Sequence, residues 1–107
     1  INEALQSACA VVLSDKIGAA ELVRTSGAGL VFESGSSESL AESLRAMLAN
    51  PRLLREMKER ALRYRHRIHP REAARYLLRI IRHHCGDGPA PGTPPWLEVS
   101  AETGGVR

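Results

Sequence analysis

The feature that most constrains the fold is a short, unbroken apolar run from Ala8 to Leu13, which ends in the polar residues Ser14 and Asp15. A run of this length is typical of a buried strand with helices on both faces of its sheet. It therefore predicts a central strand of a parallel sheet. Residues 30–32 predict a second strand, which is shorter and nearer to an edge.

Helices are expected around both strands. Residues 2–7 contain helix-forming residues, and residues 19–24 after Gly18 provide about two helical turns. Ser36 or Ser37 can cap a further helix by accepting a hydrogen bond from a backbone amide of its first turn. Its apolar face is predicted to contain Leu40, Ala41, Leu44, Met47 and Leu48.

Two prolines predict where the last helices begin. Proline fits the first position of a helix, so Asn50-Pro51 predicts a helix that extends to about Arg67. His69-Pro70 repeats this arrangement and predicts a final helix that extends to about His84. The residues of that helix expected to face inward are Ala73, Ala74, Leu77, Ile80 and Ile81.

The order of these elements predicts an α/β fold, with a parallel sheet, right-handed crossovers and C-terminal helices that pack on the sheet. Two strands alone would leave an open hydrogen-bonding edge, so we expect further strands to belong before residue 1. Residues 85–107 contain four Pro and five Gly among 23 residues and are expected to form a disordered tail.

Length and composition restrict the class of protein. A chain of 107 residues with 43% hydrophobic residues accommodates one small domain and excludes a large enzyme. No apolar run approaches the ~18 residues that a membrane-spanning helix requires. Cys9 and Cys85 form no metal or redox spacing, which indicates reduced thiols and a cytoplasmic protein. The absence of an initiator Met indicates processing or a piece of a longer chain.

The positive charge is concentrated in one part of the chain. Residues 51–85 hold eleven basic and three acidic residues, a balance of +8, although the whole chain carries only +3. Arg71, Arg75, Arg79 and Arg82 form a row on the last predicted helix. This row is a solvated face or a peripheral contact with an anionic membrane, through Arg71, Arg75 and Arg79. Without interleaved aromatic residues it predicts no nucleic-acid partner.

Three carboxylates are candidates for a binding role. Glu3 lies on the helix before the first strand, and ligands gather near the carboxyl ends of parallel strands in this fold class. The alternative is a solvated helical glutamate. Asp15 either accepts bonds from ligand hydroxyls or caps its loop, and Glu21 either contacts a ligand or pairs with Arg24.

No other sequence pattern indicates a binding, metal or catalytic site. The glycines Gly18, Gly27 and Gly29 form no phosphate-binding fingerprint. The four histidines lie among arginines and away from Cys or acidic clusters, so we expect no metal site. No catalytic residue is assigned.

Several segments in their order resemble the C-terminal half of group 1 (family 4) glycosyltransferases over residues 1 to about 84. They are Asn2-Glu3-Ala4-Leu5, residues 10–15, 18–23, 29–32 and 37–42, and the helix from Asn50-Pro51 to Met57. The resemblance implies a GT-B enzyme of two Rossmann-like domains. Residues 1–84 would then form a partial Rossmann-like domain, which is part of the donor-binding one. It implies transfer of a hexosyl group from a nucleotide-sugar donor, with no metal held by this domain and no further cofactor.

The resemblance also assigns one residue. The family signature is a pair of glutamates with seven residues between them, and Glu3 matches the second, which hydrogen-bonds the ribose hydroxyls of the donor. The first glutamate, the phosphate-binding residues and the acceptor domain would lie before Ile1, so the fragment alone is expected to be inactive. Ala8-Cys9-Ala10 departs from the Gly-x-Pro common in the family, which predicts a looser loop. The acceptor is not specified.

A second hypothesis of another class is a non-catalytic helical adaptor that binds an anionic surface through its Arg-rich helices.

Overall fold

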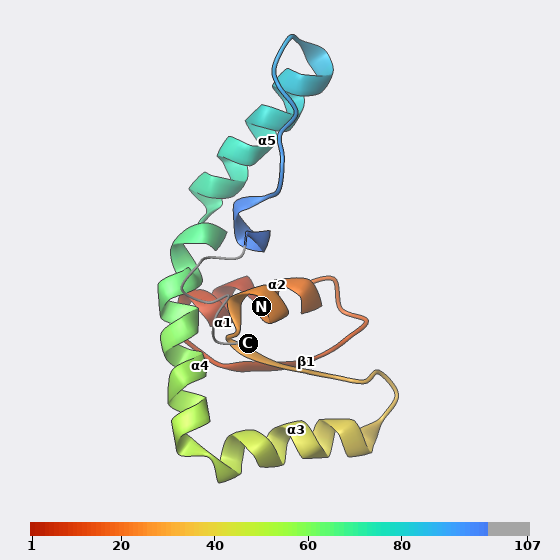
Figure 1. Cartoon of the computed structure of the whole chain (residues 1–107), viewed down its shortest axis with the longest axis vertical. Helices are drawn as coiled ribbons and strands as arrows, with labels where there is room; N and C mark the ends of the chain where they lie inside the picture. Colours follow the sequence, from red (N-terminus) through yellow and green to blue (C-terminus); the bar gives the residue numbers. More distant parts are fainter. Residues whose placement is uncertain (99–107) are drawn as a thin grey trace.

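Two short parallel strands lie between layers of helices in the computed structural model, which describes residues 1–98 (Figure 1). The elements in chain order are α1 (Asn2–Gln6), β1 (Val11–Ser14), α2 (Ala20–Ser26), β2 (Gly29–Phe32), α3 (Ser37–Ala49), α4 (Pro51–Tyr64), the 3-10 helix η1 (Arg65–Ile68), α5 (Pro70–Cys85) and the 3-10 helix η2 (Pro95–Leu97). The predicted α/β class, with two parallel strands followed by helices, is confirmed.

The sheet pairs β1 with β2 in parallel, with Val11 opposite Gly29 and Ser14 opposite Phe32. Within residues 1–98, β1 has no second neighbouring strand. Leu13 is its only buried residue. The prediction that β1 belongs to a parallel sheet is therefore confirmed. Within residues 1–98, however, β1 has a strand on one side only and is mostly half-buried.

Gly29 allows the two strands to approach each other closely. A Cβ atom at this position would lie 2.1 Å from the carbonyl oxygen of Val11 and 2.8 Å from its Cγ2. Such distances are far below van der Waals contact, so a side chain at residue 29 requires the strands to move apart. The glycine thus fixes where β2 begins against β1.

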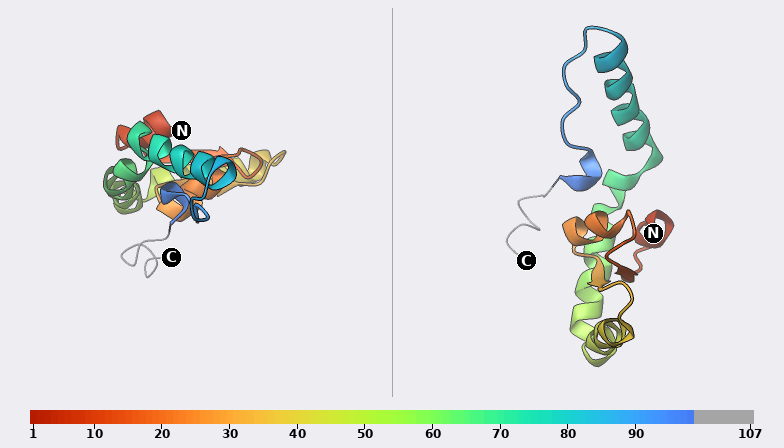
Figure 2. Two further views of the ribbon diagram at one scale, coloured as in Figure 1. Left: turned by 90° about the horizontal axis from the view of Figure 1, so that it is seen from above. Right: turned by 90° about the vertical axis from the view of Figure 1, so that its right-hand side faces the viewer.

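Helices cover both faces of the sheet (Figures 1 and 2). α1 and α2 lie on one face and α3 on the other, while α4 leads back from α3 towards α1. Side chains alternate between the faces of a strand, so Leu13 packs with Val23 of α2. A second buried cluster joins α1, α2 and α4 and contains Leu5, Leu22, Ala28, Ala61, Tyr64 and Ile68.

The predicted helix starts are confirmed at three capping residues. The side chains of Ser36, Asn50 and His69 each accept a hydrogen bond from a backbone N–H of the following turn, at 3.0, 3.1 and 3.1 Å. Pro51 and Pro70 occupy the first positions of α4 and α5. Local sequence therefore determines where these helices begin.

The predicted inward face of the last helix is wrong. α5 leaves η1 and extends away from the sheet and its covering helices (Figures 1 and 2), and none of its residues is buried. The expected inward-facing residues Leu77 and Ile81 are exposed because α5 projects beyond the sheet and its covering helices. Within residues 1–98, α3 packs on the sheet, and α4 packs on α1, α2 and α3.

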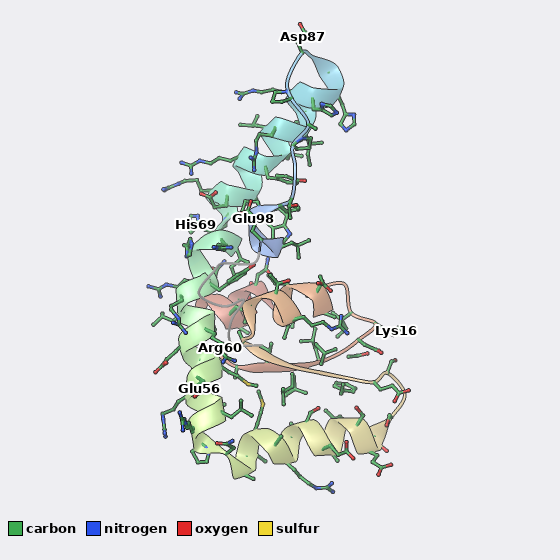
Figure 3. All side chains as sticks on the ribbon, viewed as in Figure 1. Lys16, Glu56, Arg60, His69, Asp87 and Glu98 are labelled. Carbon is green, nitrogen blue, oxygen red and sulfur yellow. The ribbon has the colours of Figure 1, made fainter. Side chains whose placement is uncertain are left out.

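Residues 86–98 run back along α5 towards the sheet (Figure 3). Asp87 lies at the tip, where the chain turns back, and Glu98 lies near the base of α5. The hydroxyl of Tyr76 donates to the carbonyl oxygen of Gly92 at 2.8 Å, and the hydroxyl of Tyr64 donates to that of Trp96.

The predicted disordered tail therefore begins with a segment that makes defined contacts. Trp96 packs against the cluster around Leu5. The remaining residues of that prediction, 99–107, lie outside the described part of the chain. The proposed boundary between residues 84 and 85 stays a prediction.

Candidate functional site

The carboxyl ends of β1 and β2 lie side by side and are joined by Asp15. Its Oδ1 accepts a hydrogen bond from the backbone N–H of Ser34 at 3.0 Å, and its own N–H donates to the carbonyl oxygen of Phe32 at 2.9 Å. Lys16 marks this end of the sheet in Figure 3. Because Asp15 links the loops that follow the two strands, the structure favours the capping interpretation of this residue.

Glu3 lies in the first turn of α1 and is exposed. Its helix is held firmly, because Leu5 is fully buried and the Gln6 side-chain amide donates to the carbonyl oxygen of Ile68 at 3.3 Å. Among residues 1–98, the Glu3 carboxylate has no hydrogen bond or ion pair. The structure thus presents an unengaged carboxylate on an anchored helix. Its role as a ribose ligand stays a prediction.

A hollow of about 310 Å³ lies beside the starts of α1 and α2. Its lining comes from α1, the loop after β1, α2, η1, α5 and η2, and consists of Asn2, Gly18, Ala19, Glu21, Leu22, Ile68, Ala73, Trp96 and Leu97. Asn2 belongs to this lining and its neighbour Glu3 does not. The structure therefore brings Asn2 and Glu21 to one concavity, while the predicted site residue lies outside it.

Trp96 and Leu97 are lining residues that sequence reasoning did not single out. The signal that could have identified them is an apolar pair, which includes the only Trp of the chain, within an otherwise Pro- and Gly-rich segment. The Trp96 ring meets the Tyr76 ring edge to face, with the ring centroids 5.4 Å apart. This contact positions one wall of the hollow.

The interpretation of Glu21 as a surface partner is supported. Its Oε2 lies 3.7 Å from Nη1 of Arg24, and both side chains are largely exposed. Exposed pairs of this kind contribute little stability, about 0–1 kcal/mol. Glu21 also contributes to the lining of the hollow.

The arginines of α4 and α5 differ in their surroundings. Arg60 is mostly buried and donates from Nη1 to the carbonyl oxygen of Gly27 at 3.3 Å, so it serves the fold. On α5, Arg75 pairs with Glu72 at 2.8 Å, and the guanidinium of Arg79 lies 5.3 Å from the Tyr76 ring centroid. The predicted row on the last helix is thus present and exposed.

Residues 1–98 contain no group of three or more His, Cys, Asp or Glu side chains that could hold a metal ion. In the same part of the chain, no helix has the length and apolar character needed to cross a bilayer.

The comparisons with known proteins bear on the segment that contains these features. The sequence matches the family described as Glycosyl transferases group 1 over residues 1–64, which extend from α1 to the end of α4. Searches of curated proteins and of solved structures gave no match. The match includes Glu3, both strands and the loops at their carboxyl ends. The chain therefore belongs to the group 1 glycosyltransferases.

Proposed function

We propose that this chain contributes the donor-binding part of a nucleotide-sugar-dependent glycosyltransferase of family 4 with GT-B architecture. The enzyme would transfer a hexosyl group to an acceptor and act in the cytoplasm. The observation that carries the proposal is the family match over residues 1–64, because it includes Glu3 at the position that resembles the ribose-binding glutamate. The non-catalytic adaptor is not favoured, because a family of transferases accounts for more than half of the chain.

The surroundings of Glu3 support a role in binding the ribose. The two oxygens of an ionised carboxylate can accept hydrogen bonds from two neighbouring hydroxyls. The Glu3 carboxylate has no partner within residues 1–98, so a ribose would not have to break an ion pair to bind it. The burial of Leu5 keeps the backbone of α1 in place, which reduces the entropy lost on binding.

The unpaired side of β1 supports the proposal that a preceding segment completes the domain. An edge strand presents unpaired backbone N–H and C=O groups that another strand can bind. Within residues 1–98, β1 pairs only with β2. We propose that residues before Ile1 add strands on this side and supply the first glutamate, the phosphate-binding residues and the acceptor domain. The described segment alone would then be inactive.

The gene provides the first test. The reading frame upstream of the codon for Ile1 should encode a glutamate separated from Glu3 by seven residues, and a second Rossmann-like half. A frame that encodes neither would contradict the proposal.

Nucleotide affinity provides the second test, on the product of the complete reading frame. Glu3→Gln should weaken binding of the preferred nucleotide among UDP, GDP and ADP by roughly tenfold to a hundredfold in isothermal titration, because hydrogen bonds to a charged group contribute about 1.5–3 kcal/mol. Glu38→Gln is the matched control, since Glu38 is an exposed first-turn glutamate on α3. Equal affinities of the two variants would contradict the assignment of Glu3.

The arginines of α5 would affect where the protein is located in the cell and would not take part in donor binding. Arg71, Arg75 and Arg79 would add a peripheral contact with an anionic surface.

A further inference from the structure

The loop that follows β1 is held by hydrogen bonds along residues 15–17. Asp15 ties it to β2 and to the loop after β2, through its backbone N–H and its carboxylate. The backbone N–H of Lys16 donates to Ser14 Oγ at 3.2 Å, and that of Ile17 donates to the carbonyl oxygen of Ser14 at 3.1 Å. The backbone of this loop is therefore held by both strands.

These bonds leave the Lys16 side chain as the free hydrogen-bond donor among residues 15–17. The backbone N–H groups of all these residues donate within the protein. The Lys16 ammonium group is exposed and forms no ion pair or hydrogen bond within residues 1–98. Because the backbone beneath it is held, only the side chain has to lose conformational freedom when Lys16 binds a ligand.

The position of Lys16 indicates which part of a donor it could contact. Ligands of open α/β sheets bind outside the carboxyl ends of the strands, and Lys16 lies at this end of the sheet (Figure 3). The assignment rests on the proposed function, which places the ribose at Glu3 and the diphosphate at residues before Ile1. The part of a nucleotide-sugar donor that remains is the transferred sugar, whose hydroxyl oxygens can accept hydrogen bonds from an ammonium group.

We propose that Lys16 binds hydroxyls of the transferred hexosyl group, and that Asp15 is a positioning residue that holds the loop so that Lys16 reaches them. Strands that pair with the free side of β1 would extend the sheet sideways, so they would leave its carboxyl edge open to the donor. Lys16 would then help to determine which sugar the enzyme accepts, because a sugar without a hydroxyl at this point loses the bond.

Isothermal titration of the product of the complete reading frame tests the contact. The ligands are UDP, GDP and ADP, and their sugar forms UDP-glucose, GDP-mannose and ADP-glucose. Lys16→Met removes the hydrogen bonds of a charged group. It should weaken binding of the preferred sugar form about tenfold and leave the affinity for the bare nucleotide unchanged.

The matched control is Lys58→Met, since Lys58 is the other lysine of the chain and is exposed on α4. This variant should bind both forms like the original protein. If Lys16→Met weakens binding of the nucleotide and of its sugar form equally, Lys16 contacts the diphosphate and the proposal is overturned. Unchanged binding of both forms would also overturn it.

The role of Asp15 is tested by a double-mutant cycle. Asp15→Ala should weaken binding of the sugar form by up to about tenfold, and Asp15→Asn, which keeps an acceptor oxygen, should not. Because Asp15 acts through Lys16, Asp15→Ala combined with Lys16→Met should bind no more weakly than Lys16→Met alone. Additive losses would overturn the positioning role. Asn50→Ala, which removes the cap of α4, is the control for a loss of stability alone and should not change the affinity.

Failure of the proposed function would give a different result. If the original protein binds none of the nucleotides or their sugar forms, the donor-binding function is refuted, and the role of Lys16 with it. If the original protein binds them and the variants at Lys16 and Asp15 bind them equally well, only the roles of these two residues are refuted.

Discussion

Replacing Gly29 with Ala should separate the ends of the two strands and destabilise the fold. The new methyl group would lie 2.1 Å from the carbonyl oxygen of Val11, which is a backbone atom and cannot rotate away. The neighbouring ladder bond, from the N–H of Val11 to the carbonyl oxygen of Ala28 at 3.2 Å, would lengthen or break as the strands move. The substitution therefore acts on the parallel pairing itself.

The size of the effect follows from the steric overlap of the new methyl group and from the loss of the backbone hydrogen bond. Overpacking costs about 1–3 kcal/mol, and a lost backbone hydrogen bond adds about 1 kcal/mol. We expect the free energy of unfolding to fall by about 3 kcal/mol, a large part of the roughly 5–15 kcal/mol typical of a domain. At about 4–8 °C per kcal/mol, the midpoint of thermal unfolding should fall by about 12–24 °C.

Thermal unfolding followed by far-ultraviolet circular dichroism measures this change. Gly18→Ala is the matched control, because a Cβ at Gly18 meets no atom within 4 Å and its backbone is not in the left-handed region. That variant should stay within about 1 kcal/mol of the original chain. If both variants unfold at the same temperature, the register that places Gly29 opposite Val11 is wrong.

Three smaller effects on stability can be measured in the same way. Asn50→Ala should lower stability by about 1 kcal/mol, because α4 loses its side-chain cap; an unchanged midpoint would refute the capping role. Arg60→Gln should cost about 1–2 kcal/mol, because it removes the bond to the carbonyl oxygen of Gly27, and exposed Arg55→Gln should have no effect. Trp96→Ala should lower the free energy of unfolding by about 2 kcal/mol, because it uncovers the cluster around Leu5. An unchanged midpoint of thermal unfolding would contradict this packing role.

Features set by near neighbours in sequence could be predicted, because their causes lie within a few residues. Ser36, Asn50 and His69 bond to backbone amides two or three positions later, so a short pattern was sufficient to place three helix starts. The apolar run before Ser14 likewise indicated β1 without knowledge of its partner. The run could not indicate that Leu13 is the only buried residue of β1, because burial depends on the elements that pack around a strand.

Features set by distant contacts could not be predicted. The need for glycine at residue 29 arises from its register against Val11, and the position of Trp96 arises from the Tyr64 hydroxyl, 32 residues earlier. The pattern of α5 indicated correctly that one face is apolar. It did not indicate what covers that face, and the prediction that this face packs on the sheet and its helices is wrong.

The position of Glu3 limits how a donor could meet this part of the protein. Successive residues of a helix point about 100° apart, so Asn2 can line the hollow beside α2 while Glu3 faces another direction. A ribose held by Glu3 would therefore lie outside the hollow. The other contacts of that ribose would come from residues that do not line the hollow. This separation is consistent with a donor site shared between this segment and the part of the enzyme proposed to precede it.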